Sequence, residues 1–329
     1  MKLKKSLAVI ALCLLAAWQV TAAPSPADVM ASAPAQTEKP APAPRADAIP
    51  LGECLAWQIA LEREGFSPGL IDGKIGPKTL LALREFRQAR GLAASDELDA
   101  DAAAALNVPS AGYTLPYTIT PEDAAQVTGW PQDWLERSRM ARMGYATMAD
   151  MAAEKFHCSQ GLLARLNEGV DFAKVKAGDA LTVPAIEAPK CPRVESLRVN
   201  LTEKVIRCFD KEGKLVALFH CSIARDKEKR PAGAALVVTV IRDPDYTFDP
   251  ALWPEVKEPQ SKLIIPPGPR NPVGLCWIAL NLPGYGMHGT PTPEMIGKTG
   301  SHGCFRLTNW DAVRLGKMLR AGVPVEFDQ

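Results

Sequence analysis

The sequence has almost no net charge and very little histidine. Its 329 residues include 38 Lys and Arg against 37 Asp and Glu, and only four His. A balanced charge offers no polybasic surface, so the composition argues against binding to nucleic acid or to an anionic membrane surface. The C-x-x-C spacing typical of structural zinc sites is missing as well. The sequence therefore predicts no metal site.

The chain also lacks an apolar run of the roughly 20 residues that a membrane-spanning helix needs. Its longest early run, 7–17, follows three lysines within the first five residues and precedes Ala22 and Ala23. This pattern predicts a signal peptide over 1–23, cleaved after Ala22 or Ala23. Leu12 before Cys13 disfavours a lipoprotein. We expect an exported protein of the periplasm or cell wall, with no transmembrane segment.

Seven cysteines remain after such a cleavage, an odd number in an oxidising compartment. We predict a disulfide between Cys158 and Cys191, which flank the second segment described below. Cys208 and Cys221 are a second candidate pair, although a simple hairpin around the turn at 211–214 would leave them out of register. One thiol is then expected to stay reduced.

Residues 24–49 form a Pro/Ala-rich linker by composition. The length that remains suffices for two or three small domains. Three segments of different character follow the linker.

The first segment, 50–108, shows two amphipathic helical patterns separated by a Gly- and Pro-rich loop, and a third helix is expected after Asp99. The loop contains Asp72-Gly73-Lys74-Ile75-Gly76-Pro77-Lys78-Thr79, and Gly91-Leu92 follows the second helix. These motifs resemble the three-helix peptidoglycan-binding domain, which implies binding to peptidoglycan glycan strands. A helical spacer that has lost glycan binding is the alternative.

The second segment, 113–186, predicts two helices, the second capped by Ser159 and ended by Asn167, and then a short strand that ends at Pro184. This order resembles a LysM module, a small α+β glycan-binding fold. A structural linker domain packed on the catalytic unit is the alternative.

The third segment, 194–329, has short runs rich in Val, Leu, Ile and Phe, then long loops, then a helix at 309–319 and a last strand at 323–327. The pattern predicts a mainly-β domain with one late helix. Two of the four histidines, His288 and His302, lie in this segment within a Gly-rich stretch that also holds Cys304. A thiol paired with a histidine has a pKa lowered to roughly 3.5–7.5, and glycines beside it leave backbone N–H groups open to an oxyanion.

His288-Gly289-Thr290, Ile296-Gly297 and Ser301-His302-Gly303-Cys304-Phe305-Arg306-Leu307 resemble the L,D-transpeptidase catalytic domain of the YkuD-like family. Upstream motifs that include Asn271-Pro272 and downstream motifs from Asn309 agree with this resemblance. It implies Cys304 as nucleophile and His288 as base, oriented by the carbonyl of Gly289. The resemblance further implies that His302 and Gly303 are catalytic and that, together with Ser301, they shape the loop before Cys304. The substrate-binding residues that it implies are Arg306, Ser301, Tyr285 and Thr290.

The implied reaction is acyl transfer between peptidoglycan stem peptides through a Cys304 thioester, which yields 3→3 cross-links with no metal or organic cofactor. Water as acceptor would make the enzyme an L,D-carboxypeptidase, and a protein lysine would make it a lipoprotein anchor. Carbapenems are expected to acylate Cys304. Because these residues all follow residue 194, we expect removal of 24–186 to spare the chemistry on soluble peptides and to lower it on intact sacculi.

Other functions are less compatible with the motif. A papain-like or NlpC-type peptidase places its cysteine before its histidine, whereas no histidine follows Cys304 here. A zinc peptidase would need ligand spacing and a carboxylate base that are not recognisable. A non-catalytic wall-binding protein is the third alternative, although no motif residue is replaced.

Overall fold

The structure is a computed structural model, and it describes residues 49–252, 259, 261–297 and 303–328. The predicted signal peptide and almost all of the linker therefore lie outside the described residues, as do Ser301 and His302. Residues 49–329 cluster into one unit by their contacts. None of the helices within the described ranges has the length and apolar character needed to cross a membrane.

Three helices form the first segment, as the sequence predicts: α1 (Leu51–Glu64), α2 (Pro77–Ala89) and α3 (Ala100–Leu106). Gly65 ends α1 in the left-handed region at φ 104°, and the Asp99 side chain caps α3 by accepting from the N–H of Ala102. The loop before α2 is held by Gln58, whose side-chain amide donates to Asp72 and accepts from the N–H of Gly73.

The middle segment contains a two-stranded antiparallel sheet and a helix pair. Its elements are β1 (Thr114–Thr118), α4 (Pro121–Ala125), α5 (Trp134–Arg139), α6 (Met148–Lys155), α7 (Gln160–Leu166) and β2 (Ala180–Pro184), with Thr114 opposite Pro184. Ser159 caps α7 and Asn167 ends it, as predicted. The strand β1 carried no clear sequence signal and is defined by its pairing with β2. The stretch that includes α5 packs on a later hairpin of β7 (Tyr246–Phe248) and β8 (Leu263–Ile265), where the rings of Trp134 and Phe248 stack with centroids 4.2 Å apart.

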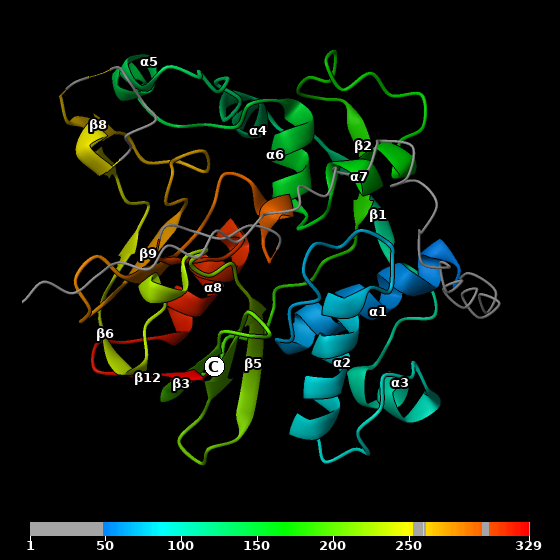
Figure 1. Cartoon of the computed structure of the whole chain (residues 1–329). Coiled ribbons are helices and arrows are strands. Elements are labelled where there is room, and N and C mark those ends of the chain that lie inside the picture. Colours follow the sequence, from blue (N-terminus) through cyan, green and yellow to red (C-terminus); the bar gives the residue numbers. More distant parts are fainter. Residues whose placement is uncertain (1–48, 253–258, 260, 298–302, 329) are drawn as a thin grey trace, which may run out of the picture. The chain divides into compact units, whose positions relative to one another are not determined.

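The last segment is built on an eight-stranded sheet within the described ranges, in the order β11-β10-β9-β6-β12-β3-β4-β5. Figure 1 labels β9, β6, β12, β3 and β5 of this sheet. Its strands are β3 (Ser196–Asn200), β4 (Val205–Phe209), β5 (Leu215–His220), β6 (Gly233–Arg242), β9 (Cys276–Leu280), β10 (Gly286–His288), β11 (Phe305–Arg306) and β12 (Pro324–Asp328). A separate hairpin pairs β7 (Tyr246–Phe248) with β8 (Leu263–Ile265), and short 3₁₀ turns lie at Lys227–Lys229, Pro250–Leu252 and Pro293–Met295. The late helix α8 (Asn309–Met318) buries Ala312, Leu315 and Met318 against the sheet.

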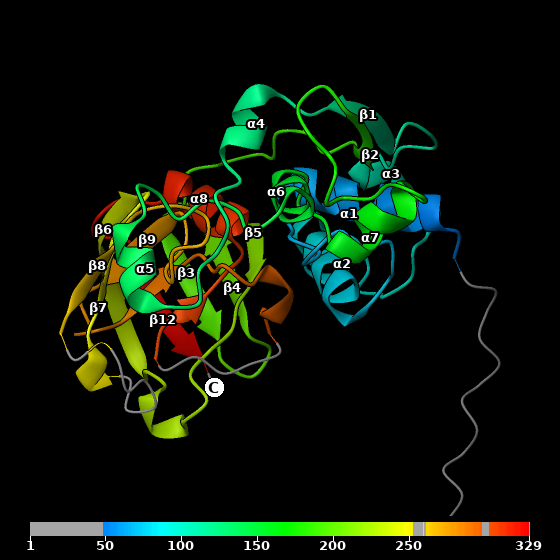
Figure 2. The same cartoon turned by 90° about the horizontal axis from the view of Figure 1, so that it is seen from above.

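Three of the hydrophobic cores are shared between segments. Val205, Leu215 and Leu218 of the sheet belong to the same buried cluster as side chains of the helices α1, α2 and α3. Of these helices, α2 lies next to β5 (Figure 1 and Figure 2). Phe66 forms a β-bridge with Leu218, and Ile71 forms one with Cys158 of the middle segment. The three segments are therefore joined by side chains that none of them buries alone.

The predicted Cys158–Cys191 disulfide is wrong in this structure, where both residues are free thiols. Cys158 is 2% exposed in the core of the middle segment, whereas Cys191 is exposed. After β2 the chain leaves that segment and runs along α1, where the N–H of Lys190 donates to the carbonyl of Arg63. This course separates the two cysteines.

The second candidate pair is also unbridged, and the β4–β5 hairpin has a register shift between Cys208 and Phe209 rather than simple pairing. Cys208 lies opposite Ala217 across β4 and β5, and His220 lies opposite Val205. Cys221 therefore follows the far end of the hairpin, and both cysteines are free and buried.

Candidate active site

The parallel pairing of β10 and β11 brings the predicted nucleophile and base to one face of the sheet edge. Met287 lies opposite Phe305, and both side chains are fully buried in the sheet core. Because side chains alternate along a strand, the residues flanking Met287 and Phe305 point to the other face. His288 and Cys304 are thus on the same face, with Arg306 directly opposite His288.

The His288 imidazole is oriented by its own backbone. Its Nδ1 lies 2.7 Å from the carbonyl oxygen of Gly289, and a carbonyl only accepts hydrogen bonds, so Nδ1 carries the proton. Nε2 is then left unprotonated, as a base requires. The ring of Trp277 stacks on the imidazole at 5.4 Å between centroids. Burial lowers the pKa of His288 to about 4, and the nearby charge of Arg306 acts in the same direction.

Cys304 lies just before β11, half-buried, with its Sγ 3.4 Å from the carbonyl oxygen of Gly284. Burial raises the pKa of the Cys304 thiol above its usual value, against the opposing effects of the Gly286 backbone and of Arg306. The sequence led us to expect a lowered thiol pKa. The structure has the reverse because desolvation outweighs the hydrogen bond and the positive charge.

With a raised thiol pKa and a lowered imidazole pKa, the two groups are both neutral near pH 7. Such a pair supports a nucleophile that loses its proton to the base during attack, rather than a preformed thiolate. The chemistry available to such a pair is general-base-assisted attack by a thiol on an electrophilic carbon.

The other predicted site residues have mixed surroundings. Gly303 lies beside the ring of Tyr285, whose hydroxyl donates to the carbonyl of Lys229 at 2.8 Å. Thr290 is 3% exposed, and its hydroxyl is within 3.3 Å of the Thr292 hydroxyl. Arg306 pairs through its backbone with Ser222. Ser301 and His302, as noted above, lie outside the described residues.

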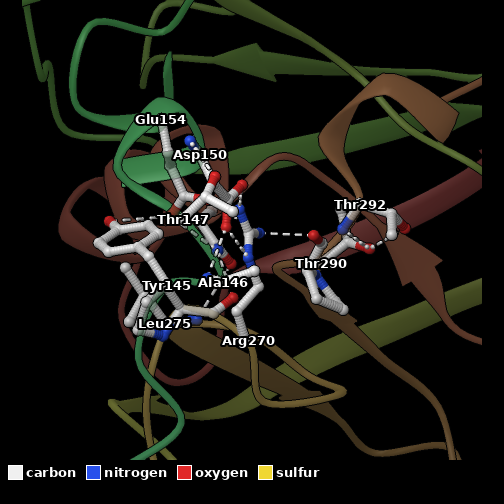
Figure 3. A network of polar contacts seen from close by, with 12 residues as sticks. Tyr145, Ala146, Thr147, Asp150, Glu154, Arg270, Leu275, Thr290 and Thr292 are labelled. Carbon is white, nitrogen blue, oxygen red and sulfur yellow. Dashed lines mark hydrogen bonds and ion pairs between the residues drawn. The ribbon is translucent and has the colours of Figure 1, made fainter. Parts of the chain in front are cut away.

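A buried polar cluster with no predicted role lies next to the stretch that follows His288. Figure 3 shows Asp150 and Glu154 of α6 turned toward Arg270, next to the stretch that follows His288. Asn309 entered the sequence motifs only as the start of a downstream segment, and neither Arg270 nor Glu154 was predicted as a functional residue. A charged residue on the buried side of an amphipathic helix would have been the clue.

The two remaining histidines have other partners. His157 pairs with Glu62 and stacks on Trp310. His220 is buried beside the carbonyl of Lys78, and burial lowers its pKa to about 3. Over the described ranges, no group of three His, Cys, Asp or Glu side chains is arranged to hold a metal ion.

Comparison with known families assigns two of the three segments. Residues 195–327 match the model of the YkuD L,D-transpeptidase catalytic domain. Residues 195–327 are an L,D-transpeptidase catalytic domain. Residues 53–106 match a peptidoglycan-binding domain model, so that domain precedes the transpeptidase domain along the chain.

Curated proteins with similar sequences are also named L,D-transpeptidases. A protein of Bacillus licheniformis named as the L,D-transpeptidase YkuD is 25% identical over 181 residues, which cover 55% of this chain and 93% of the relative. A protein of Bacillus subtilis named as the L,D-transpeptidase YqjB is 27% identical over 119 residues, covering 35% of this chain and 60% of the relative.

Solved structures with this name are similar only loosely. The L,D-transpeptidase of Xylanimonas cellulosilytica (residues 123–326) has a TM-score of 0.35 at 16% identity and covers 88% of this chain and all of that chain. The L,D-transpeptidase of Mycobacterium smegmatis has a TM-score of 0.33 at 16% identity, covering 46% of this chain and 64% of that one. Scores this low support no comparison of detail.

Proposed function

We propose that this protein is a peptidoglycan L,D-transpeptidase that forms 3→3 cross-links through a thioester on Cys304, with His288 as general base and acid. The observation that carries the proposal is the His288–Gly289 hydrogen bond on the same strand face as Cys304, inside a transpeptidase domain. It leaves Nε2 unprotonated, so Nε2 can act as the proton acceptor.

The first half-reaction forms the acyl-enzyme. The Cys304 sulfur attacks the carbonyl carbon of the third residue of a donor stem peptide while His288 Nε2 takes the thiol proton. Backbone N–H groups around Gly303 stabilise the oxyanion. The C–N bond to the terminal D-alanine then breaks, and His288 returns the proton to the leaving amine.

The second half-reaction releases the enzyme. The side-chain amine of a neighbouring stem's diamino acid attacks the thioester carbonyl and gives a proton to His288. The C–S bond breaks, His288 returns the proton to the sulfur, and a 3→3 cross-link results. Arg306, Tyr285 and Thr290, with Ser301 and His302, contact the substrate or shape its loop in this proposal.

The upstream segments act in wall binding in this proposal. The peptidoglycan-binding domain, and the LysM-like segment 113–186 with it, raise the local concentration of glycan strands at the enzyme. The protein is exported to the periplasm or cell wall and contributes to cell-wall biogenesis and cell shape.

The test is muropeptide analysis by mass spectrometry of tetrapeptide substrate incubated with the purified chain. We expect 3→3 dimers and free D-alanine with wild type, and neither with Cys304→Ala. Cys191→Ala is the matched control, because that exposed thiol lies outside the sheet edge and should leave the yield unchanged. Carbapenem should add one adduct, mapped to Cys304.

The products also decide between acceptors. Tripeptide without dimer would identify an L,D-carboxypeptidase, and transfer to a lysine-bearing protein would identify an anchoring enzyme. Undiminished cross-linking by Cys304→Ala would refute the proposal, and a folded wild type with no product and no adduct would indicate a non-catalytic wall-binding protein.

A further inference from the structure

The side chain of Glu154, from outside the catalytic domain, contacts two residues that hold the backbone just after His288. Glu154 lies on α6 in the middle segment and is 6% exposed. Its Oε1 accepts a hydrogen bond from Nδ2 of Asn309 at 2.9 Å, and its Oε2 lies 3.3 Å from Nη1 of Arg270. Each oxygen therefore binds a different side chain of the catalytic domain, and Figure 3 shows Glu154 beside Arg270.

The Asn309 side chain is the first support. It is fully buried, its Nδ2 also donates to the carbonyl of Pro269, and its Oδ1 accepts from the N–H of Leu275. A Cβ placed on Gly289 would lie 2.1 Å from this Oδ1, so the Gly289 backbone rests directly on the Asn309 amide. Gly289 is the residue whose carbonyl holds the imidazole of His288.

The Arg270 guanidinium is the second support. Its side chain is 2% exposed, and it donates to the carbonyl of Pro291, two residues after Gly289. Nε of Arg270 donates to Asp150 at 2.7 Å, and the guanidinium forms an ion pair with the same carboxylate. The backbone that follows His288 is thus held at Gly289 by Asn309 and at Pro291 by Arg270.

We propose that Glu154 is a positioning residue for His288, acting through Asn309 and Arg270 on the carbonyl of Gly289. The inference rests on the proposed function, in which His288 moves the proton. A displaced Gly289 carbonyl would rotate the ring or release Nδ1, and a misplacement of about 1 Å costs as much as 10²-fold in rate. The middle segment then contributes to catalysis as well as to binding.

The local charges support a specific role for this carboxylate. Asp150 already supplies Arg270 with a counter-ion, so Glu154 is not needed to neutralise the guanidinium. Burial raises the pKa of Glu154 to about 8, even though Asn309 and Tyr145 donate to it, so near pH 7 this carboxyl group is largely protonated and contributes hydrogen-bond acceptors rather than charge. Burying this carboxyl group is costly, and charge balance does not require it. Its place in the core is therefore best explained by its contacts with Asn309 and Arg270.

The experiment uses the full chain with Glu154→Gln. The amide keeps the shape and one acceptor, but its NH₂ group faces Arg270 and opposes that contact. We expect the rate of Cys304 acylation by a carbapenem, and kcat on tetrapeptide, to fall by roughly 10–100-fold with little change in KM. Arg270→Lys, which keeps the charge but loses the fork geometry, should act in the same direction.

The matched control is Glu85→Gln. Glu85 is also a buried carboxylate on a helix outside the catalytic domain, and it pairs with Arg207 of the sheet, far from His288. Its loss should lower stability and leave acylation near the wild-type rate. A Glu154→Gln protein that acylates at the wild-type rate, or a Glu85→Gln protein that is equally slow, would overturn the inference.

A second readout does not depend on turnover. Among four histidines, the His288 imidazole resonances are assigned by their loss in His288→Gln. Glu154→Gln should shift or broaden them, while Glu85→Gln should not; unchanged His288 resonances in Glu154→Gln would refute the positioning role. If the wild type neither cross-links nor is acylated, the proposed function fails while this measurement still decides the positioning role.

Discussion

At the scale of single residues, the site is governed by desolvation. Burial drives the Cys304 thiol and the His288 imidazole toward their neutral forms; the charge of Arg306 opposes this effect at the thiol and adds to it at the imidazole. A neutral thiol does not react in the absence of a base, so the proton acceptor must act within the attacking step.

The pH dependence of Cys304 follows from these shifts. His288 is a competent base above its pKa of about 4, so carbapenem acylation should rise through pH 4 and level off by about pH 5. Alkylation by iodoacetamide reports thiolate instead, so it should keep rising past about pH 8.5. Peptide mapping of Cys304 measures both rates, and an alkylation rate that levels off below pH 7 would indicate a preformed thiolate–imidazolium pair.

At the scale of elements, α2 is attached to the sheet by an ion pair as well as by apolar packing. Arg207 on β4 bonds to Glu85 on α2 through Nε at 3.1 Å, and it also bonds to Glu203. The side chains of Arg207 and Glu85 are 15% and 9% exposed. This pair fixes a helix of the peptidoglycan-binding domain to the middle of a catalytic strand.

Loss of this attachment should be measurable as stability. Arg207→Ala leaves Glu85 buried without its partner, and breaking a buried pair costs about 3 kcal/mol in free energy of unfolding. Arg84→Ala on the same helix removes a pair whose side chains are 47% and 49% exposed, and it should cost under about 1 kcal/mol. Denaturant unfolding compares them, and equal losses would show that the Arg207 pair is not structurally special.

At the scale of the whole described unit, the segments depend on each other for their cores. The catalytic sheet contributes Val205, Leu215 and Leu218 to the core of the N-terminal helices. The middle segment contributes Glu154 to the cluster behind His288. The sequence alone led us to expect a separable catalytic domain, and these contacts favour the opposite result.

A chain of residues 194–329 should therefore fail as an independent enzyme. It exposes apolar side chains whose burial contributes about 1.5–3 kcal/mol each, and it loses Glu154. We expect non-cooperative unfolding, binding of hydrophobic dyes and severely reduced Cys304 acylation. A chain of residues 49–329 keeps every described contact and is the control; full acylation and cooperative unfolding of the short chain would contradict this reading.

Local signals were enough for much of the fold and for the chemical groups of the site. The caps at Asp99 and Ser159 mark helix starts because a side chain and the N–H it accepts from lie within three residues. His288, Gly289 and Cys304 were identified by motif before any pairing was known. The strand β1 was not, because it is defined by its partner β2, more than 60 residues away.

The sequence by itself determined which residues can do chemistry, since motif and spacing depend on the chain alone. Only the tertiary structure decided the protonation, the oxidation and the contacts of the side chains. The raised pKa of Cys304 comes from burial, and the reduced state of Cys158 comes from a chain course that carries Cys191 away. The link from Glu154 to Asn309 spans 155 positions. Burial and long-range contact depend on the whole fold, so no local pattern could have revealed them.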